Sequence, residues 1–450
     1  MRGFMDVSII GTGYVGLISG LGLAKAGHNV LLVDKRGHVL EKIMRAQPPF
    51  YEPGLQELLT EVLESKRLST TTSIAHAISK TELTLVCVGT PSRPDGSIDL
   101  SDVSAVAQEI GNALKQKTSF HAIIIKSTVV PGTTHSMSSI ISAACGKTHG
   151  DGFGVGMNPE FLREGNAIED ALNPDRIVLG ADDEKTSAKM AELYSFSKAP
   201  LLRVNTKTAE MIKYANNSFL ALCISYSNEI AQICEKTGGI NAYDVMKGVT
   251  LDGRLASNGK QAAITSYLAP GCGFGGSCFP KDVKALRNFS QSIGHPSKLI
   301  GNIMEINESQ ISLTIEKLQT SLKGLFGKKI AVLGVAFKPD TDDIRESPSL
   351  KIIERLLASG SKVSACDPQA LENARKVFGD KISYCASARE ALKDADAAIL
   401  ATKWQEFKKL AAQDFKSLMK NPLLLDCRGF YNAEDFSKVL QYELIGYRKG

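Results

Sequence analysis

The stretch from Pro270 to Asp282 holds the residues of this chain whose types and spacing could do covalent chemistry. It reads Pro-Gly-Cys-Gly-Phe-Gly-Gly-Ser-Cys-Phe-Pro-Lys-Asp, with Cys278 after a run of glycines and Asp282 four residues later. Glycines let the backbone turn tightly and let a ligand approach closely. A thiol near the cation of Lys281 and a carboxylate can become an activated nucleophile. A glycine-rich turn with a buried cysteine explains this stretch equally well.

The composition of the chain limits what this chemistry could serve. A length of 450 residues predicts two or three domains, and a net charge of +5 disfavours nucleic acid but admits an anionic small substrate. The nine cysteines form no Cys-x-x-Cys pair and no histidine cluster lies nearby, so no metal site is predicted. Reduced thiols and the lack of a membrane-spanning apolar run lead us to expect a soluble cytoplasmic protein without a membrane partner.

A dinucleotide-binding fingerprint occurs near the start of the chain. The apolar run Val7–Ile10 predicts a buried strand, and Leu17–Ala26 predicts a helix of small residues. Between them stands Gly-Thr-Gly-Tyr-Val-Gly, in which Gly11 makes the turn, Gly13 lets the backbone approach a pyrophosphate and Gly16 permits close helix–strand packing. The helix N-terminus then supplies N–H donors to the phosphates.

An acidic residue follows the second predicted strand, Val30–Val33. The carboxylate of Asp34 can accept both ribose hydroxyls and repels a 2′-phosphate, which favours NAD over NADP, although Lys35 and Arg36 weaken that preference. We assign to the cofactor site Gly11, Gly13, Tyr14, Val15, Gly16, Asp34 and Lys35.

Polar residues follow several further predicted strands. The strand-like runs cover residues 83–88, 122–125, 153–157, 177–179 and 201–204. Thr90, Thr128 and Glu160 come after three of them, and ligands of doubly wound sheets bind beyond the carboxyl ends of strands. We therefore expect these three side chains to line one crevice. A simple helix or turn cap is the alternative for Thr128.

The middle of the chain predicts long helices. Residues 206–236 contain neither proline nor glycine and carry apolar residues at helical spacing, with Thr206 as a possible cap. Lys213 and Asn217 are four residues apart and so share one face, where a solvated lysine and an ordinary polar residue are the alternative. A second helical stretch covers residues 296–322, and such helices could form a hinge and a dimer surface.

A second α/β unit begins after Gly327. Strands are predicted at residues 329–333, 362–366, 397–400 and 423–425, with a helix at 348–358. The turn at Gly334 lacks the dinucleotide fingerprint, whereas Lys338 and Arg428 follow strands and suit a phosphate group. The predicted fold is α/β, with two Rossmann-like doubly wound domains joined by a long central helix. The predicted domains are residues 1–205, 206–320 with the cysteine loop, and 321–450.

Taken together, these motifs resemble those of the nucleotide-sugar 6-dehydrogenases, the UDP-glucose/GDP-mannose dehydrogenase family. The matching stretches are Gly11–Gly16, Tyr51–Leu55, Lys126–Thr128, Asn158–Gly165, Lys213–Asn217, Gly273–Asp282 and Phe337–Pro348. The resemblance implies an N-terminal NAD-binding domain, a dimerising helical linker and a C-terminal UDP-binding domain. It also implies oxidation of a sugar C6 alcohol to a carboxylate with two NAD.

The resemblance gives the catalytic candidates their roles. Cys278 would add to the aldehyde, and the resulting thiohemiacetal would be oxidised to a thioester. Asp282, Lys213 and a water would handle the first proton, and Lys213 with Asn217 would stabilise the oxyanion. Thr128 and Glu160 would position or activate the hydrolytic water. The remaining implied residues are Thr90, Thr128, Glu164 and Arg345 for the cofactor, and Phe161, Leu162, Glu164, Lys213, Asn217, Arg254, Tyr267, Gly275, Phe337, Lys338 and Arg428 for the substrate.

One segment departs from the family pattern. Arg254 would reach the substrate of a neighbouring subunit, but the segment from Arg254 to Tyr267 is longer here than in the family pattern.

Other functions remain open from the sequence. The loop at residues 270–276 resembles that of family members acting on UDP-glucose more than that of members acting on GDP-mannose, and UDP-N-acetylmannosamine dehydrogenases fit less well around Cys278. A two-electron β-hydroxyacid dehydrogenase needs no catalytic cysteine, and a non-catalytic NAD sensor would make no NADH.

Overall fold

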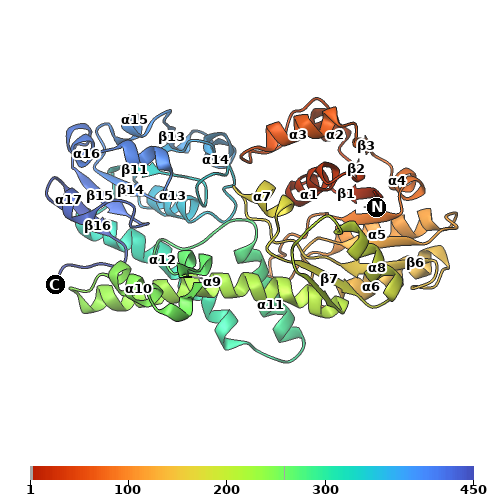
Figure 1. Cartoon of the computed structure of the whole chain (residues 1–450). Coiled ribbons are helices and arrows are strands. Elements are labelled where there is room, and N and C mark those ends of the chain that lie inside the picture. Colours follow the sequence, from red (N-terminus) through yellow and green to blue (C-terminus); the bar gives the residue numbers. More distant parts are fainter. Residues whose placement is uncertain (1–3, 258) are drawn as a thin grey trace. The chain divides into compact units, whose positions relative to one another are not determined.

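The chain folds into two compact units, residues 1–216 and 217–450 (Figure 1). The computed structural model describes residues 4–257 and 259–450. The domain boundaries expected at residues 205 and 320 stay a prediction, and residues 1–3 of the expected first domain lie outside the described residues.

The first unit is built on an eight-stranded sheet. Its order is β3-β2-β1-β4-β5-β6-β7-β8, and every pair is parallel except β6 with β7. The strands are β1 Asp6–Ile10, β2 Asn29–Val33, β3 Leu68–Thr71, β4 Leu83–Val86, β5 His121–Ile125, β6 Phe153–Met157, β7 Ile177–Ala181 and β8 Leu201–Val204. Strand order reverses between β1 and β4, which is where ligands of such sheets bind.

Helices cover both faces of this sheet, which is why its strands read as apolar runs. They are α1 Tyr14–Lys25, α2 Gly37–Met44, α3 Leu55–Glu64, α4 Ile74–Lys80, α5 Ser101–Leu114, α6 Thr133–Cys145, α7 Ala167–Leu172 and α8 Glu184–Leu193. One core packs α1, α2 and α3 against one face, and another packs α4, α5 and α6 against the other. The predicted strands are present, whereas the first helix begins at Tyr14, three residues before the expected Leu17.

The long helix α9 spans Thr206–Thr237, close to the predicted range. The expected cap is wrong, because Asn205 Oδ1 accepts the amide N–H of Thr208 at 2.8 Å. Thr206 Oγ1 instead donates to Asp182 at 2.5 Å. An amide side chain one residue earlier therefore satisfies the free N–H groups of the first turn.

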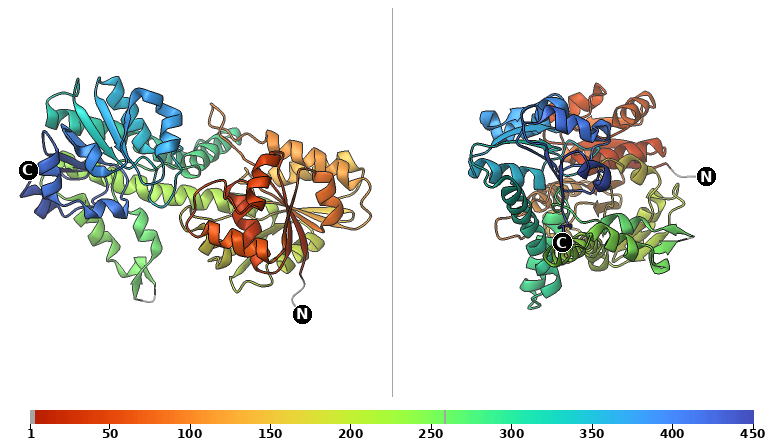
Figure 2. Two further views of the ribbon diagram at one scale, coloured as in Figure 1. Left: turned by 90° about the horizontal axis from the view of Figure 1, so that it is seen from above. Right: turned by 90° about the vertical axis from the view of Figure 1, so that its left-hand side faces the viewer.

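The second unit carries a six-stranded parallel sheet with its own core (Figure 2). Its order is β13-β12-β11-β14-β15-β16, and its strands are β11 Lys329–Leu333, β12 Lys362–Cys366, β13 Ser383–Tyr384, β14 Ala397–Leu400, β15 Leu423–Asp426 and β16 Gln441–Leu444. The flanking helices are α13 Pro348–Ala358, α14 Leu371–Phe378, η3 Gly379–Lys381, α15 Ala388–Leu392, η4 Gln405–Lys409, α16 Ala412–Leu418 and α17 Ala433–Ser437. This confirms the predicted fold class.

Shorter elements connect α9 to this second sheet. They are α10 Ala242–Thr250, η1 Gly253–Leu255, β9 Ala256–Ser257, β10 Lys260–Gln261, η2 Ala263–Tyr267, α11 Phe279–Ser292 and α12 Lys298–Leu322. The strands β9 and β10 pair as a small antiparallel hairpin. This hairpin lies between Arg254 and Tyr267.

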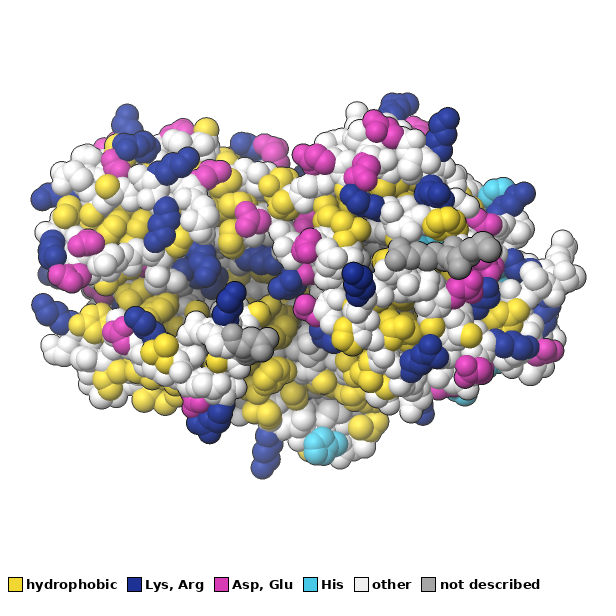
Figure 3. Space-filling view, viewed as in Figure 1, with side chains coloured by type: hydrophobic (Ala, Val, Ile, Leu, Met, Phe, Trp, Pro, Cys, Tyr) yellow, Lys and Arg dark blue, Asp and Glu magenta, His cyan; other side chains and the backbone are white. Residues whose placement is uncertain are grey.

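Basic and acidic side chains are interspersed on the face of each unit shown in Figure 3. Within the described residues, no helix has the length and apolarity needed to cross a bilayer. No group of three or more histidine, cysteine or acidic side chains suited to a metal ion occurs in that part of the chain.

Candidate active site

The fingerprint loop of the first unit has the backbone geometry that its glycines permit. Gly11 has a φ of +96°, and a Cβ added at Gly16 would lie 1.8 Å from the carbonyl oxygen of Gly11. A Cβ added at Gly13 would meet no atom within 4 Å. Gly11 and Gly16 are therefore required by the fold, whereas the space at Gly13, at the N-terminus of α1, fits the pyrophosphate of a dinucleotide.

Asp34 stands at the end of β2 beside this loop. Its carboxylate accepts the amide N–H and hydroxyl of Thr12 at 3.0 and 2.7 Å and the side chain of Arg36 at 2.9 Å. Burial alone would raise the pKa of Asp34, but the hydrogen bonds from Arg36 and Thr12 outweigh it and lower that pKa. Asp34 is therefore ionised at neutral pH. Lys35 is exposed and lies 3.9 Å from Asp102.

Tyr14 is held by a residue that sequence reasoning did not assign to the site, Glu52. The Tyr14 hydroxyl donates to Glu52 Oε2 at 2.6 Å, and Glu52 also accepts the amide N–H groups of Gly165 and Ala167 at 2.7 Å. Burial and then the Glu52 carboxylate raise the pKa of Tyr14. Glu52 therefore links the fingerprint to the loop that carries Glu164. Glu52 lies within the matching stretch Tyr51–Leu55, which was the sequence signal that could have identified it.

The carboxyl ends of β4, β5 and β6 bring together most of the predicted polar residues of this unit. Thr90 Oγ1 donates to the carbonyl oxygen of Thr128 at 3.0 Å. Glu160 Oε1 lies 2.8 Å from Lys213 Nζ, and Glu160 Oε2 accepts the amide N–H of Leu162 at 2.6 Å. Burial would raise the pKa of Glu160, but the attraction and hydrogen bond of Lys213 outweigh it and lower that pKa. The Glu160–Lys213 pair is therefore ionic as well as buried.

A second lysine near this pair was missed. Lys126 is buried, donates to Asn158 Oδ1 at 2.8 Å, and its charge contributes to the lowered pKa of Glu160. Phe161 lies beside the same pair, with Lys213 Nζ 5.4 Å from its ring centre. Lys126 is the first residue of the matching stretch Lys126–Thr128, so the sequence contained its motif. The sequence did not show that its ammonium lies close enough to Glu160 to lower the pKa of that carboxylate.

Cys278 of the second unit occupies the N-cap position of α11 and is half-buried, which argues against a fully buried structural thiol. The carbonyl oxygen of Cys278 accepts the amide N–H of Asp282 at 2.9 Å. The Asp282 side chain is 1 % exposed and accepts from Lys281 at 2.5 Å and from Asn217 at 2.6 Å. The helix thus places the thiol and a buried, fully engaged carboxylate one turn apart.

The cysteine loop, residues 270–278, needs glycines where other parts of the chain approach its backbone closely. A Cβ at Gly275 would lie 2.3 Å from the carbonyl oxygen of Glu346, and one at Gly276 would lie 2.8 Å from the Phe337 ring. Asn307 of α12 braces the loop, because it accepts the amide N–H of Phe274 at 2.8 Å and donates to its carbonyl at 3.1 Å. Asn307 carried no sequence signal, since it lies in the middle of a long helix.

Basic residues expected at the substrate lie at the carboxyl edge of the second sheet. Arg428 donates to the carbonyl oxygens of Ala401 at 2.7 Å and Gly273 at 3.1 Å, which ties it to the cysteine loop. Lys338 follows β11, with its ammonium 5.5 Å from the Phe337 ring centre.

Three further predicted residues are placed by local contacts. Arg345 and Arg254 each pair with the aspartate two positions earlier, Asp343 at 2.7 Å and Asp252 at 2.5 Å. The Tyr267 ring centre lies 6.1 Å from that of Phe279, the residue after Cys278.

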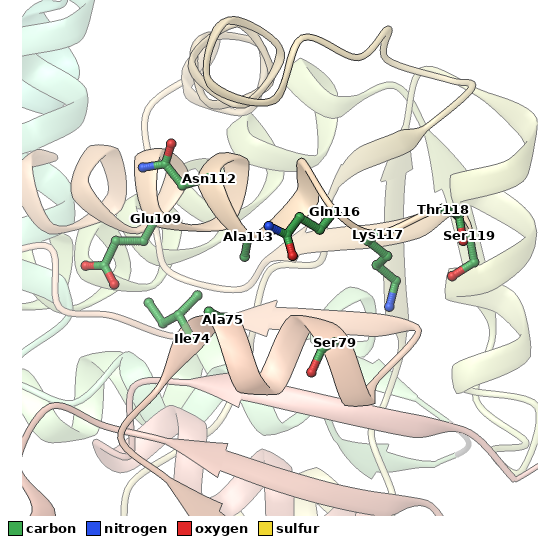
Figure 4. A pocket seen from close by; sticks show the side chains of 10 residues that line it. All are labelled: Ile74, Ala75, Ser79, Glu109, Asn112, Ala113, Gln116, Lys117, Thr118 and Ser119. Carbon is green, nitrogen blue, oxygen red and sulfur yellow. The ribbon is translucent and has the colours of Figure 1, made fainter.

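A pocket occurs in the first unit (Figure 4). It has a volume of about 700 Å³ and is lined by α4, the C-terminal half of α5 and the segment before β5. Lys117 on its wall already donates to the carbonyl oxygens of Ile78 and Thr81 at 2.6 Å. None of the predicted site residues lines this pocket, so its size does not mark the active site.

The open space at Gly13 and the carboxylate of Asp34 suit a bound NAD. Three family models match consecutive parts of the chain. They are the NAD binding domain at residues 5–197, the central domain at 207–309 and the UDP binding domain at 331–433 of the UDP-glucose/GDP-mannose dehydrogenase family. The chain belongs to this family and is an NAD-dependent oxidoreductase.

Relatives match over nearly the whole chain. The UDP-glucose 6-dehydrogenase YwqF of Bacillus subtilis is 36% identical over 98% of both chains. The UDP-glucose 6-dehydrogenase of Rhizobium meliloti is 40% identical over 98% of this chain and 99% of its own. The solved UDP-glucose dehydrogenase of Pyrobaculum islandicum is 36% identical, superimposes with a TM-score of 0.91 and covers 99% of both chains.

Proposed function

We propose that the chain oxidises UDP-glucose to UDP-glucuronate in two successive steps at one sugar carbon. The observation that carries the proposal is the half-buried Cys278 at the start of α11, one turn from the buried Asp282. A two-electron alcohol dehydrogenase has no use for such a thiol. The names of the curated relatives support UDP-glucose as the substrate.

The cofactor residues of the first unit hold NAD by their backbone and carboxylate groups. NAD, when bound, accepts two electrons in each of the two oxidations. The N-terminus of α1 and the space at Gly13 bind the pyrophosphate, and Asp34 accepts from the ribose hydroxyls. Thr90 and Glu164 of this unit are further proposed cofactor residues, as is Arg345 of the second unit, and Glu52 positions Tyr14.

Cys278 is the proposed covalent anchor of the intermediate. Its sulfur adds to the aldehyde carbon to form a thiohemiacetal, and the second oxidation converts this adduct to a thioester. Water then attacks the thioester carbonyl, which releases the carboxylate and returns the thiol. Asp282, Lys213 and Asn217 are proposed to move the first proton and to stabilise the oxyanion.

Glu160 and Thr128 are the proposed groups for the hydrolytic water. The lowered pKa of Glu160 keeps its carboxylate ionised, so it can accept a hydrogen bond or a proton from water. The proposed substrate residues remain Phe161, Leu162, Glu164, Lys213, Asn217, Arg254, Tyr267, Gly275, Phe337, Lys338 and Arg428. The proposed division of labour assigns the cofactor to residues 1–205, the thiol and subunit contacts to 206–320, and UDP to 321–450.

NADH stoichiometry tests the overall reaction. We expect two NADH per UDP-glucose and no comparable turnover of GDP-mannose or UDP-N-acetylmannosamine. One NADH per sugar would instead indicate a two-electron dehydrogenase, and no NADH with any nucleotide sugar would indicate a non-catalytic NAD-binding protein.

The Cys278→Ser variant tests the thiol. We expect turnover to fall by about a thousandfold or more, with NAD and UDP affinities unchanged, because the hydroxyl is a much weaker nucleophile at neutral pH. Cys145→Ser, at another half-buried cysteine, is the matched control. Normal turnover of Cys278→Ser would remove this residue from the mechanism.

The protein is also proposed to form a homodimer in the cytoplasm. Phe219, Tyr226 and Ile233 recur every seven residues along α9 and are 55%, 46% and 56% exposed, which makes an apolar stripe suited to a second copy. Nine free cysteines support a reducing compartment.

Light scattering on a sizing column tests the dimer. We expect Tyr226→Glu to shift the protein toward a monomer, whereas the same change at the exposed Phe326, outside the stripe, should not. A monomeric wild type at micromolar concentration would contradict the proposal.

A further inference from the structure

Three neighbouring strands of the second sheet are each followed by a basic residue. β11 pairs with β14, and β14 pairs with β15, all in parallel. Lys338 follows β11, Lys403 follows β14 and Arg428 follows β15. The carboxyl ends of parallel strands share one edge, so the three residues emerge from the same edge of the sheet. Lys403 between the other two was not among the residues assigned to the substrate.

The backbone around Lys403 is fixed on both sides. Thr402 is buried and donates to the carbonyl oxygen of Ala336 at 2.6 Å. Trp404 is also buried and donates its indole N–H to Asp367 Oδ2 at 3.0 Å. Lys403 itself is exposed, and its backbone is held in place by these two hydrogen-bonded neighbours.

The charged group that acts on Lys403 is the cation Arg428. The Arg428 guanidinium donates to two carbonyl oxygens and, within the described residues, makes no ion pair, although the buried Asp426 carboxylate accepts the amide N–H of Arg428 at 2.8 Å. Lys403 likewise makes no hydrogen bond or ion pair with any described residue. Partial desolvation of its ammonium and the charge of Arg428 lower the pKa of Lys403. Two neighbouring cations repel each other, and an anion bound by both relieves this repulsion.

We propose that Lys403 acts with Arg428 as a binding residue for the diphosphate of the nucleotide sugar. The guanidinium offers a planar pair of donors, and the ammonium adds a point charge on a flexible stem, which together suit two linked phosphates. This inference rests on the proposed function, because it takes a nucleoside diphosphate as the group bound by the second unit. A lysine that serves only solubility is the alternative.

Calorimetry on the full chain with UDP, UMP and uridine tests this role. We expect Lys403→Met to weaken UDP binding about tenfold and to leave uridine binding unchanged, since only the phosphates lose a partner. The KM for UDP-glucose should rise by a similar factor at constant kcat. The UDP affinity of the variant should depend less steeply on salt. Lys403→Arg should restore binding.

Lys409→Met, an exposed lysine of the following turn η4, is the matched control and should bind UDP as the wild type does. Equal UDP affinities of the wild type and Lys403→Met would overturn the role of Lys403 while leaving the proposed function intact. A wild type that binds no UDP would overturn both. Thermal melting of each variant shows whether the fold is kept.

Discussion

The two sheets of this chain share their strand order over six strands, yet they use the same carboxylate position differently. Asp34 directly follows β2 in the first sheet, and Asp367 directly follows β12 in the second. Each accepts the amide N–H that follows the glycine at the end of the first strand, Thr12 after Gly11 and Val335 after Gly334. Both glycines have positive φ, +96° and +94°. Both sheets therefore use the same hydrogen bond between the aspartate after the second strand and the turn after the first strand.

The remaining partners of the two carboxylates differ. Asp34 is also bound by Arg36, a side chain that is 51% exposed and can move aside for a ribose. Asp367 is instead bound by Ala336, Gln369, Ala370 and the indole of Trp404, which is only 5% exposed. A carboxylate with a mobile partner can bind a ligand, whereas one saturated by backbone and a buried indole holds the loop in place.

The helix that follows the first strand also differs. In the first unit α1 begins three residues after Gly11, so its free N–H groups lie at the glycine turn. In the second unit α13 begins at Pro348, fourteen residues after Gly334. The second sheet therefore offers side-chain cations where the first offers a helix N-terminus.

The largest effect that would test this comparison is loss of the Asp367 charge. Asp367→Asn replaces an acceptor oxygen by an NH₂ group facing existing N–H donors, so we expect unfolding free energy to fall by about 4 kcal/mol. NAD affinity should not change. Denaturant titration measures the loss, with the exposed Asp380→Asn as control. A loss below about 1 kcal/mol would contradict a structural role for this carboxylate.

A buried histidine gives the first sheet an acid sensitivity, and no strand of the second sheet contains a histidine. His121 of β5 lies 2.7 Å from Thr84 Oγ1, and burial lowers its pKa to about 3. In the unfolded chain this histidine takes up a proton near pH 6.5, whereas in the folded protein it stays neutral down to about pH 3. The free energy of unfolding is therefore highest above pH 6.5 and decreases as the pH falls from 6.5 toward 3. Between pH 6.5 and 4 the loss is about 3 kcal/mol.

His121→Gln should flatten this dependence, because an amide does not titrate. Urea titrations at pH 7, 5.5 and 4.5 measure it, and His135→Gln, at an exposed histidine of α6, should keep the wild-type slope. Equal slopes for the wild type and His121→Gln would show that other groups set the acid sensitivity.

Much of this comparison was visible in the sequence, and the rest depended on tertiary contacts. The apolar runs predicted the strands of both units, and the three glycines with Asp34 predicted the cofactor turn. Glu52, Asn307 and Lys403 were missed, because their meaning comes from backbone groups and charges distant in the sequence. The cap of α9 was misplaced by one residue, since Asn205 and Thr206 are both good capping types.

Gly13→Ala separates cofactor binding from folding. Gly13 has φ −73° and ψ −167°, which alanine adopts freely, and its added Cβ would meet no protein atom within 4 Å. We expect stability to stay within about 1 kcal/mol and the NAD dissociation constant to rise about thirtyfold, because the methyl group occupies space needed by the pyrophosphate. Gly248→Ala, with similar open space in α10, is the control. Unchanged NAD affinity would place the pyrophosphate elsewhere.

Asp34→Ser is expected to have the smallest effect and tests the role of the mobile partner directly. Without the carboxylate, Arg36 is released and the repulsion of a 2′-phosphate disappears. We expect the ratio of kcat/KM for NADP to that for NAD to rise about tenfold. Asp6→Ser changes an exposed carboxylate at the amino end of β1 and should leave the ratio unchanged. A contrary result would be that Asp34→Ser lowers the free energy of unfolding as strongly as Asp367→Asn and leaves the cofactor preference unchanged. Both carboxylates would then be structural, and other residues of the first unit would have to set the choice between NAD and NADP.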